Sequence, residues 1–371
     1  MLVMSKGALS LSQAETYYDE KYARDDYYTE DRTVAGEWFG IGAAALGLTG
    51  TATRADFTAI LRGVDPRTGA ELVAKAQGRE QRRAGWDATF SAPRSVSIQA
   101  LVGGDPRLIA THREAVTAAL GELETYAQAR RRRGQEWVTT GNLAAVRFDH
   151  LAARPSRTGT EKGYAPDPQL HTHVVIANLT RRPDGVWRSL EPLEIYRSQS
   201  WATALYRSHL AERLGQLGYG IEVTGRRGEW EIAGYTRDQI MEFSNRRRDI
   251  ERELERRGVS GAAAAQNVAH STRLAKDHRN EAELKFEWRE RAATMGLDFS
   301  LVGITVGSRP SFLERCAQAR GAVTHSAAHN SERDAVMDRR ELETNALQQG
   351  MGATSLMMCD ARQSSAGKMV S

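Results

Sequence analysis

His171 and His173 lie two residues apart in a stretch that we expect to form a β-strand over 171–180. Side chains two apart in a strand project from the same face, so the two imidazoles would lie side by side. His150 ends another predicted strand, 143–150, and would complete a set of three. Three protein ligands leave coordination positions open for phosphate oxygens, as in a catalytic metal centre. The alternatives are a chance pair or a hydrogen-bonded pair in a core.

A group of tyrosines near the N-terminus could supply a nucleophile. Five of the chain's 11 tyrosines fall there, namely Tyr17, Tyr18, Tyr22, Tyr27 and Tyr28. A phenol has a pKa of about 10 and is almost wholly protonated at neutral pH, so a catalytic tyrosine needs a nearby cation or base. The predicted metal would serve that purpose and would also stabilise charge on a phosphoryl group. The alternative is that all five are core or stacking residues.

Asp87 is a candidate partner for these groups. The predicted strand 86–90 places Asp87 and Thr89 on one face, in an otherwise apolar run. A carboxylate there could accept a hydrogen bond from the outer nitrogen of a ligand histidine and so select its tautomer. It could instead help to deprotonate a tyrosine, or it could be a strand-end aspartate that caps a turn.

Arginine clusters point to a polyanionic partner. The net charge is only +4, with a pI of about 9.1, but the arginines are grouped as Arg130–Arg133, Arg226-Arg227, Arg246–Arg248 and Arg256-Arg257. Arginine is preferred where planar contacts to phosphate are made. Each single cluster is explained equally well as a solvated helix face, and only their recurrence favours nucleic acid. Arg226, Arg227 and Arg247 are the candidate DNA contacts in these clusters, with the 221–232 hairpin as a candidate groove reader.

Bulk composition excludes several classes of protein. The chain of 371 residues is 40% hydrophobic and 26% charged, which is ordinary for a soluble globular protein. No apolar run approaches the length of a membrane span, and the N-terminus lacks the apolar core of a secretory signal. The two cysteines, Cys316 and Cys359, allow no disulfide framework and no cysteine-based zinc site in the body of the chain. We therefore expect a cytoplasmic protein without membrane insertion.

Strands and helices alternate along the chain, with hairpins, which predicts an α+β fold with an antiparallel-rich sheet. The elements expected beyond those above are helices at 10–30, 108–131, 201–217, 236–257 and 280–296, and hairpins at 137–150 and 219–232. After residue 300 the pattern weakens. We expect weak order over 301–330, a helix within 332–349, and disorder from 357 to the end.

Four motifs taken together resemble the relaxase domain of MobF-type conjugative relaxases, which are HUH endonucleases. They are Tyr17-Tyr18 with Tyr27-Tyr28, the stretch Asp87-Ala-Thr-Phe-Ser-Ala-Pro-Arg-Ser-Val-Ser97, His150, and Asp167-Pro-Gln-Leu-His-Thr-His173. The resemblance covers roughly residues 1–300. It implies a palm of antiparallel strands flanked by helices, a helical fingers region over DNA, and a poorly ordered C-terminal tail. The implied domains are a relaxase domain at 1–300 and, at 301–371, a linker or truncated remnant preceding an absent helicase.

The resemblance also implies roles for single residues. Tyr17 matches the family's first nucleophile and Tyr27 the tyrosine of the second strand transfer, with Tyr18 and Tyr28 as their neighbours. The remaining matches are Asp87 as the assisting acid, His150, His171 and His173 as ligands of a divalent metal ion (Mg, Mn or Zn), and Arg154 as a contact to DNA phosphate. The implied reaction is nicking of one strand at a transfer origin (oriT), which leaves a 5′-phosphotyrosyl link and a free 3′-OH and is later reversed to rejoin the strand.

The implied partners are single-stranded DNA and a hairpin at the transfer origin, accessory relaxosome proteins and a coupling protein, with export alongside the DNA through a secretion channel. Many members continue into a helicase, but this chain has no Gly-x-x-x-x-Gly-Lys-[Ser/Thr] motif, so we expect no ATPase or helicase activity in it. Three other functions compete: a metal-dependent nuclease that uses water as nucleophile, a non-enzymatic DNA-binding or plasmid-control protein, and a cupin-like metalloenzyme. The last is disfavoured because no carboxylate and later histidine in barrel strands follow His173.

Overall fold

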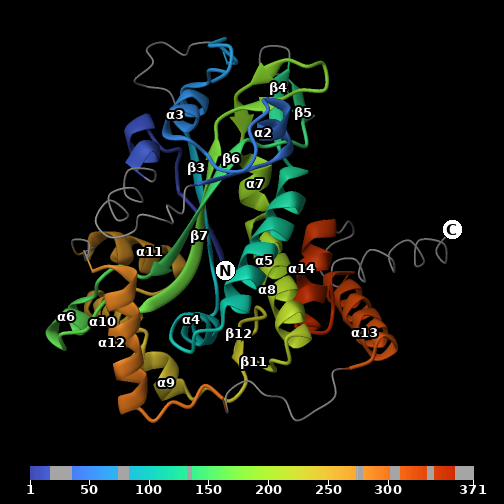
Figure 1. Cartoon of the computed structure of the whole chain (residues 1–371). Coiled ribbons are helices and arrows are strands. Elements are labelled where there is room, and N and C mark those ends of the chain that lie inside the picture. The colour runs from blue at the N-terminus through green and yellow to red at the C-terminus, as the bar shows by residue number, and fades with distance from the viewer. Residues whose placement is uncertain are drawn as a thin grey trace.

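A five-stranded antiparallel sheet forms the centre of the molecule (Figure 1). The computed structural model describes residues 1–16, 36–73, 83–131, 136–272, 274, 279–300, 310–331 and 338–355. The sheet order is β1-β3-β7-β6-β2, with bounds Leu2–Met4 for β1, Glu37–Phe39 for β2, Gly85–Ser91 for β3, Ala145–Ala152 for β6 and Pro168–Ala177 for β7. Every neighbouring pair in it is antiparallel, which confirms the predicted α+β fold with an antiparallel sheet.

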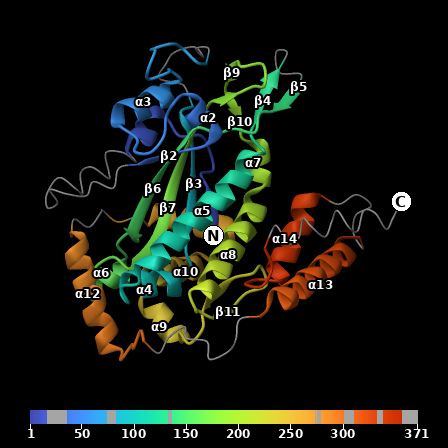
Figure 2. The same cartoon turned by 45° about the vertical axis from the view of Figure 1, so that its right-hand side comes forward.

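The described residues also form three smaller sheets, which lie at the ends of the central one. They are β10-β4-β5, β8-β9 and β11-β12. Their strands are β4 (Gln128–Arg131), β5 (Glu136–Thr139), β8 (Thr180–Arg181), β9 (Trp187–Arg188), β10 (Leu190–Glu191), β11 (Ile221–Val223) and β12 (Trp230–Ile232). The first two small sheets lie at one end of the central sheet, and β11-β12 lies toward the other (Figures 1 and 2).

Helices cover both faces of the central sheet and extend beyond it. Residues 11–16 are helical. The other helices are α2 (Ile41–Ala45), α3 (Arg54–Arg62), α4 (Arg94–Leu101), α5 (Pro106–Glu124), α6 (Arg157–Glu161), α7 (Leu193–Arg197), α8 (Gln199–Gln216), α9 (Arg237–Glu242), α10 (Asn245–Arg257), α11 (Ala262–Ser271), α12 (Glu281–Thr294), α13 (Phe312–Ser331) and α14 (Arg339–Gln349). None of the helices in the described ranges is both long and apolar enough to cross a membrane.

Alternation along β7 divides the core into two layers. Val174 and Ile176 pack with residues of α4, α5 and α8 on one face. Val175 and Ala177 pack on the opposite face with α3, Trp38 and the helix at 11–16. By the same alternation His171 and His173 belong to the second face. The elements that position the histidines are therefore β3, β7 and β6, backed by α5 and α8.

The predicted helix over 108–131 ends earlier than expected. α5 stops at Glu124, and Gln128–Arg131 form β4, which pairs with β5. The buried Glu124 carboxylate accepts hydrogen bonds from the backbone N–H groups of Ile41 and Leu143, both at 2.7 Å. These long-range contacts fix the end of α5 at Glu124. The arginines that follow are good helix formers, which is why their local sequence predicted a longer helix.

The predicted hairpin over 137–150 is wrong in its pairing. β5 pairs with β4, and β6 pairs with β7 and β2. The connection at Gly141-Asn142 is instead held by the Asn142 side chain, which donates to the carbonyls of Thr140 and Arg181 at 2.8 and 2.6 Å. The turn therefore sends the chain from one sheet to another.

The predicted helix over 236–257 is divided into α9 and α10. Its capping box at Thr236 and Gln239 is present as expected, as is the one at Asn280 and Glu283 that begins α12. The break falls where Phe243 is fully buried and the backbone N–H of Asn245 donates to the Asp167 carboxylate at 2.7 Å. Tertiary contacts thus override a locally continuous helical pattern.

The weak order expected over 301–330 is contradicted for 312–331, which forms α13. α13 packs against α14, and α14 packs against α8. The fully buried Glu343 accepts a hydrogen bond from Trp201 Nε1 at 2.7 Å, so burial against the body of the protein compensates for a weak local signal. The expected helix within 332–349 is present as α14, while the stretch expected to be disordered, 357–371, lies outside the described residues.

Candidate functional site

His150, His171 and His173 meet on one face of the central sheet. β6 and β7 are adjacent, and their register places His150 directly opposite His171 and Phe148 opposite His173. The ring centroids are 5.2 Å apart for His150 and His171, 5.1 Å for His150 and His173, and 5.2 Å for His171 and His173. The chain therefore brings together the three imidazoles that the sequence singled out.

This spacing fits three imidazoles around one metal ion. With metal–nitrogen bonds of about 2.0–2.1 Å, tetrahedral ligation would place ring centroids about 5 Å apart. The described residues nevertheless contain no set of three histidine, cysteine or carboxylate side chains arranged to hold a metal as they stand, and the rings of His150 and His171 stack at 28°. Strand register sets the ring separations, whereas rotation about side-chain bonds can re-aim each ring.

Asp87 and Thr89 lie beside His173, as the strand prediction placed them. His173 Nδ1 lies 2.9 Å from Asp87 Oδ2 and 3.0 Å from Thr89 Oγ1, and the threonine hydroxyl donates to Asp87 Oδ2 at 3.0 Å. A carboxylate only accepts hydrogen bonds when ionised, so Nδ1 of His173 carries the proton. Nε2 is then the nitrogen left for a ligand.

His171 is held in the same tautomer by the backbone. Its Nδ1 lies 2.9 Å from the carbonyl oxygen of Gln169, which can only accept. Burial, and secondarily the nearby His173, lowers the pKa of His171 to about 3. The ring is therefore neutral at pH 7 and presents Nε2.

A buried chain of side-chain hydrogen bonds contacts β7 on the face opposite the three histidines, and the sequence did not lead us to predict it. His112, which lies on the buried face of α5, is 2.7 Å from the Tyr206 hydroxyl through Nδ1 and 2.9 Å from Thr172 Oγ1 through Nε2. Thr172 in turn donates to Asp149 at 2.6 Å. Burial lowers the pKa of His112 to about 4. The clue in the sequence was a histidine on the apolar face of an otherwise amphipathic helix.

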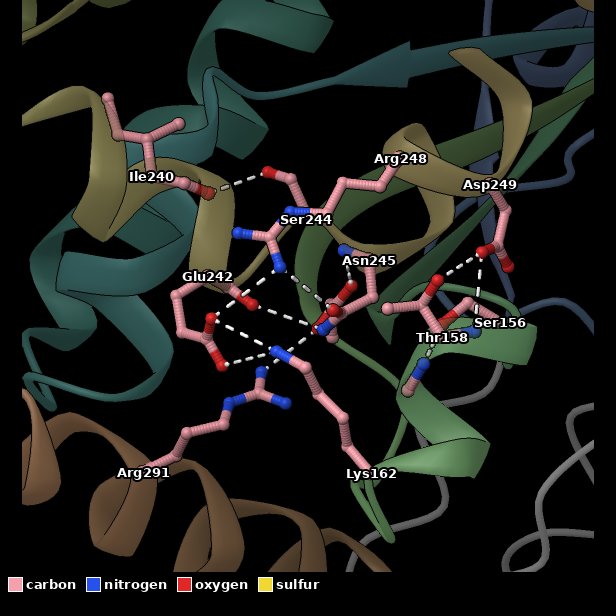
Figure 3. A network of polar contacts seen from close by, with 12 residues as sticks. Ser156, Thr158, Lys162, Ile240, Glu242, Ser244, Asn245, Arg248, Asp249 and Arg291 are labelled. Atoms are coloured by element: carbon pink, nitrogen blue, oxygen red, sulfur yellow. Dashed lines mark hydrogen bonds and ion pairs between the residues drawn. The ribbon is translucent and has the colours of Figure 1, made fainter. Parts of the chain in front are cut away.

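A second buried network holds the chain just before β7 (Figure 3). The Asp167 carboxylate accepts from the side-chain amide of Asn245 and from Arg291, both at 2.9 Å. The side chains of Asp167 and Arg291 are only 2% and 4% exposed. Arg291 also stacks over Phe243 and Tyr164, with 4.4 and 4.6 Å from its guanidinium carbon to the ring centroids. α10 and α12 are thereby tied to the residues that lead into the histidine strand.

Asp167→Ala should destabilise the fold strongly. It leaves the buried Arg291 guanidinium with only the more distant Glu287 carboxylate, at 3.6 Å, and breaking a buried pair costs about 3–5 kcal/mol. The matched control is Glu253→Ala, which removes the half-buried partner of Arg256 and Arg257 within the surface helix α10 and should cost far less than the loss of Asp167. Urea unfolding of both variants measures the difference, and similar small losses would show that the Asp167 network adds little.

The tyrosines and arginines are the remaining residues predicted for the site. Tyr17, Tyr18, Tyr27 and Tyr28 lie outside the described residues. Arg226 and Arg227 are exposed in the β11–β12 loop. Arg247 is exposed on α10 and pairs with Glu251 at 2.7 Å, and Arg154 is half-buried after β6. The structure does not gather these arginines into one cluster.

The family assignment follows from comparison with known proteins. Residues 11–295 match the model of a family described as TrwC relaxase. The chain belongs to the TrwC relaxase family. This relaxase is 36% identical over 301 residues to the multifunctional conjugation protein TraI of Escherichia coli K12, in an alignment that covers 78% of the chain and 16% of TraI. It thus spans less than a fifth of that relative's length.

Solved structures of TrwC agree with the assignment. A copper-bound conjugative relaxase TrwC in complex with oriT DNA superposes with a TM-score of 0.69 at 36% identity, covering 81% of this relaxase and 100% of that chain. TrwC with a 27-mer DNA comprising the recognition hairpin and the cleavage site gives a TM-score of 0.68 at 34% identity, with the same coverage. The predicted family resemblance and the predicted fold class are confirmed.

Proposed function

We propose that this relaxase cuts one strand of transfer-origin DNA by attack of Tyr17 on a phosphate next to His150, His171 and His173. The phenol gives up its proton as its oxygen bonds to phosphorus, the bond from phosphorus to the 3′-oxygen breaks, and that oxygen takes up a proton to become the free 3′-OH. One phosphodiester replaces another, so no ATP is needed and reversal rejoins the strand. The convergence of the three histidines is the observation that carries this proposal.

The three histidines would hold the divalent ion through their Nε2 atoms. When bound, a divalent cation polarises a phosphoryl oxygen and stabilises the charge that develops on it. The candidate ions are Mg²⁺, Mn²⁺ and Zn²⁺, and imidazole ligands favour Zn²⁺ among them. Asp87 would keep His173 in its tautomer and would supply a carboxylate beside the site to assist the nucleophile.

The ends of the segment that carries the tyrosines support their placement near this site. Ala14 is fully buried in the core layer on the histidine face. At the other end Gly36 lies directly against β6, because a Cβ there would lie 2.5 Å from Val146 Cγ1 and 2.6 Å from Phe148 Cε1. Phe148 is the cross-strand partner of His173. The described residues on either side of 17–35 therefore lie on the histidine face of the sheet, which supports the proposal that Tyr17 is the nucleophile.

The DNA partner is proposed from the relatives and from charge. The TrwC structures in complex with oriT DNA, one with its recognition hairpin, support single-stranded DNA and a hairpin as ligands here. We propose Arg154, Arg226, Arg227 and Arg247 as phosphate contacts. The following proposals rest on the family alone. They are accessory relaxosome proteins and a coupling protein as partners, a cytoplasmic location with export alongside DNA, and a domain boundary at residue 300.

A denaturing gel tests the proposed reaction. An end-labelled single-stranded oligonucleotide spanning the transfer origin should form a covalent protein–DNA adduct with Mn²⁺ present and none with EDTA. Mass spectrometry of the adduct should locate the phosphate on Tyr17. Free cleaved product without an adduct would instead identify a nuclease that uses water, and DNA binding with no cleavage would identify a non-enzymatic binding protein.

A further inference from the structure

The start of β7 is where the histidine site reaches the end of regular strand pairing. His171 lies opposite Ser91, the last residue of β3, on one side and opposite His150 on the other. Just beyond this point the register between β6 and β7 shifts, between His150 and Ala152. Pro168, the first residue of β7, has no backbone N–H to donate. The backbone that leads into His171 therefore depends on contacts other than a regular ladder.

Ser97 of α4 makes one of these contacts, with Leu170. The backbone N–H of Leu170 donates to Ser97 Oγ at 3.0 Å, and the Leu170 carbonyl accepts from the N–H of Ala92, also at 3.0 Å. The Ser97 hydroxyl donates in turn to the carbonyl of Pro93 at 3.3 Å. Ser97 and Leu170 are both fully buried, so the Leu170 N–H depends on a protein partner.

Arg94 makes the second contact, on the other side of Gln169. Its Nη1 donates to the carbonyl of Pro168 at 2.6 Å. Gln169 thus lies between two held residues, and its own carbonyl oxygen lies 2.9 Å from His171 Nδ1. A carbonyl can only accept, so the direction of this one decides which nitrogen of His171 carries the proton.

α4 is itself anchored on its other side by β12. The backbone N–H and the hydroxyl of Ser95 donate to Glu231 Oε2 at 2.7 and 2.6 Å, and Ser95 Oγ accepts from the N–H of Ile232 at 2.7 Å. Val96 is fully buried in the core layer that α4 shares with α5 and α8. The two side chains that reach β7 therefore come from a fixed element and not from a free loop.

We propose that Ser97 and Arg94 are positioning residues for His171. They fix the backbone around Gln169, whose carbonyl then accepts from Nδ1–H of His171 and leaves Nε2 to bind a divalent ion. This role deepens the proposed function and rests on it, because it assigns His171 to the metal. A merely structural role would require only that the two side chains stabilise the packing of α4.

Nitrogen NMR of the imidazoles in the full, metal-free chain tests the tautomer directly. With isotopically labelled histidine at about pH 8, where imidazoles of ordinary pKa are neutral, His171 should show a protonated Nδ1 and an unprotonated Nε2. Its signals are assigned by their loss in His171→Gln. Ser97→Ala and Arg94→Met should shift them toward a mixture of the two tautomers. Arg94→Lys keeps a charged donor and should preserve the original signals.

Zn²⁺ affinity, measured by competition with a fluorescent chelator, is the second readout. Ser97→Ala and Arg94→Met should weaken binding about 10–100-fold, the usual loss when a group behind a metal ligand is removed. Ser326→Ala is the matched control, because Ser326 is also a buried helix serine and donates to the carbonyl of Leu342 at 2.8 Å, between α13 and α14. It should lower thermal stability while leaving Zn²⁺ affinity and the His171 signals unchanged.

An unchanged tautomer or an unchanged Zn²⁺ affinity in the folded variants overturns the proposal, and so does a loss of affinity in Ser326→Ala as large as in Ser97→Ala. If Ser97→Ala does not fold, the Arg94 pair decides, and equal behaviour of Arg94→Met and Arg94→Lys then overturns it. Failure of the proposed function is distinguishable. The unaltered protein and His171→Gln would then bind Zn²⁺ equally well, while the tautomer signals would still differ between the variants.

Discussion

His171→Ala should lower metal affinity and nicking rate by more than about 100-fold, since even residues that only support a metal ligand contribute about 10–100-fold. The reason is geometric. Two imidazoles would remain, and the ring that is lost lies 5.2 Å from each of the others and presents a neutral Nε2 at pH 7. Competition with a fluorescent chelator measures Mn²⁺ or Zn²⁺ affinity, and gel assays measure nicking.

His329→Ala is the matched control for this variant. His329 is an exposed histidine on α13, so its loss should leave metal affinity and nicking unchanged. If His171→Ala bound metal as tightly as the unaltered protein, the three histidines would be a hydrogen-bonded core group and the metal centre would have to be sought elsewhere.

Tyr17→Phe should reduce adduct formation by at least about 10³-fold, because removing a nucleophile removes the covalent step itself. Affinity for the origin oligonucleotide should change by less than about threefold, since phosphate contacts dominate binding. Quantifying the adduct on denaturing gels and the affinity by anisotropy separates the two effects.

Tyr18→Phe is the closest control, because it removes a phenol from the adjacent residue. It should keep most adduct formation, and Tyr27→Phe should affect a second strand transfer more than the first. A Tyr17→Phe variant that forms adduct at the original rate, with the phosphate mapped to another tyrosine, would reassign the nucleophile.

Local patterns were reliable guides where one residue's environment depends on its near neighbours. Alternation along β7 correctly predicted that His171 and His173 share a face. Alternation along the neighbouring strand β3 correctly predicted the same for Asp87 and Thr89. The capping boxes before α9 and α12 were also correct. These features need only backbone periodicity and side chains three residues apart.

Errors arose where distant residues compete with local preference. The arginines after Glu124 favour helix, yet they pair with β5 because Glu124 is held by Ile41 and Leu143. The break before Asn245 exists because Asp167 accepts its N–H. Propensity cannot anticipate partners that are tens of residues away.

The sequence by itself determined the kinds of group available: three imidazoles, a carboxylate, clustered phenols, and the motifs that identify a relaxase. Only the tertiary structure decided that His150 lies opposite His171, that Asp87 faces His173, and that buried networks around His112 and Asp167 brace the strand between them. The physical reason is that strand register and helix packing are set by contacts between distant segments, and each residue alone is compatible with many such arrangements.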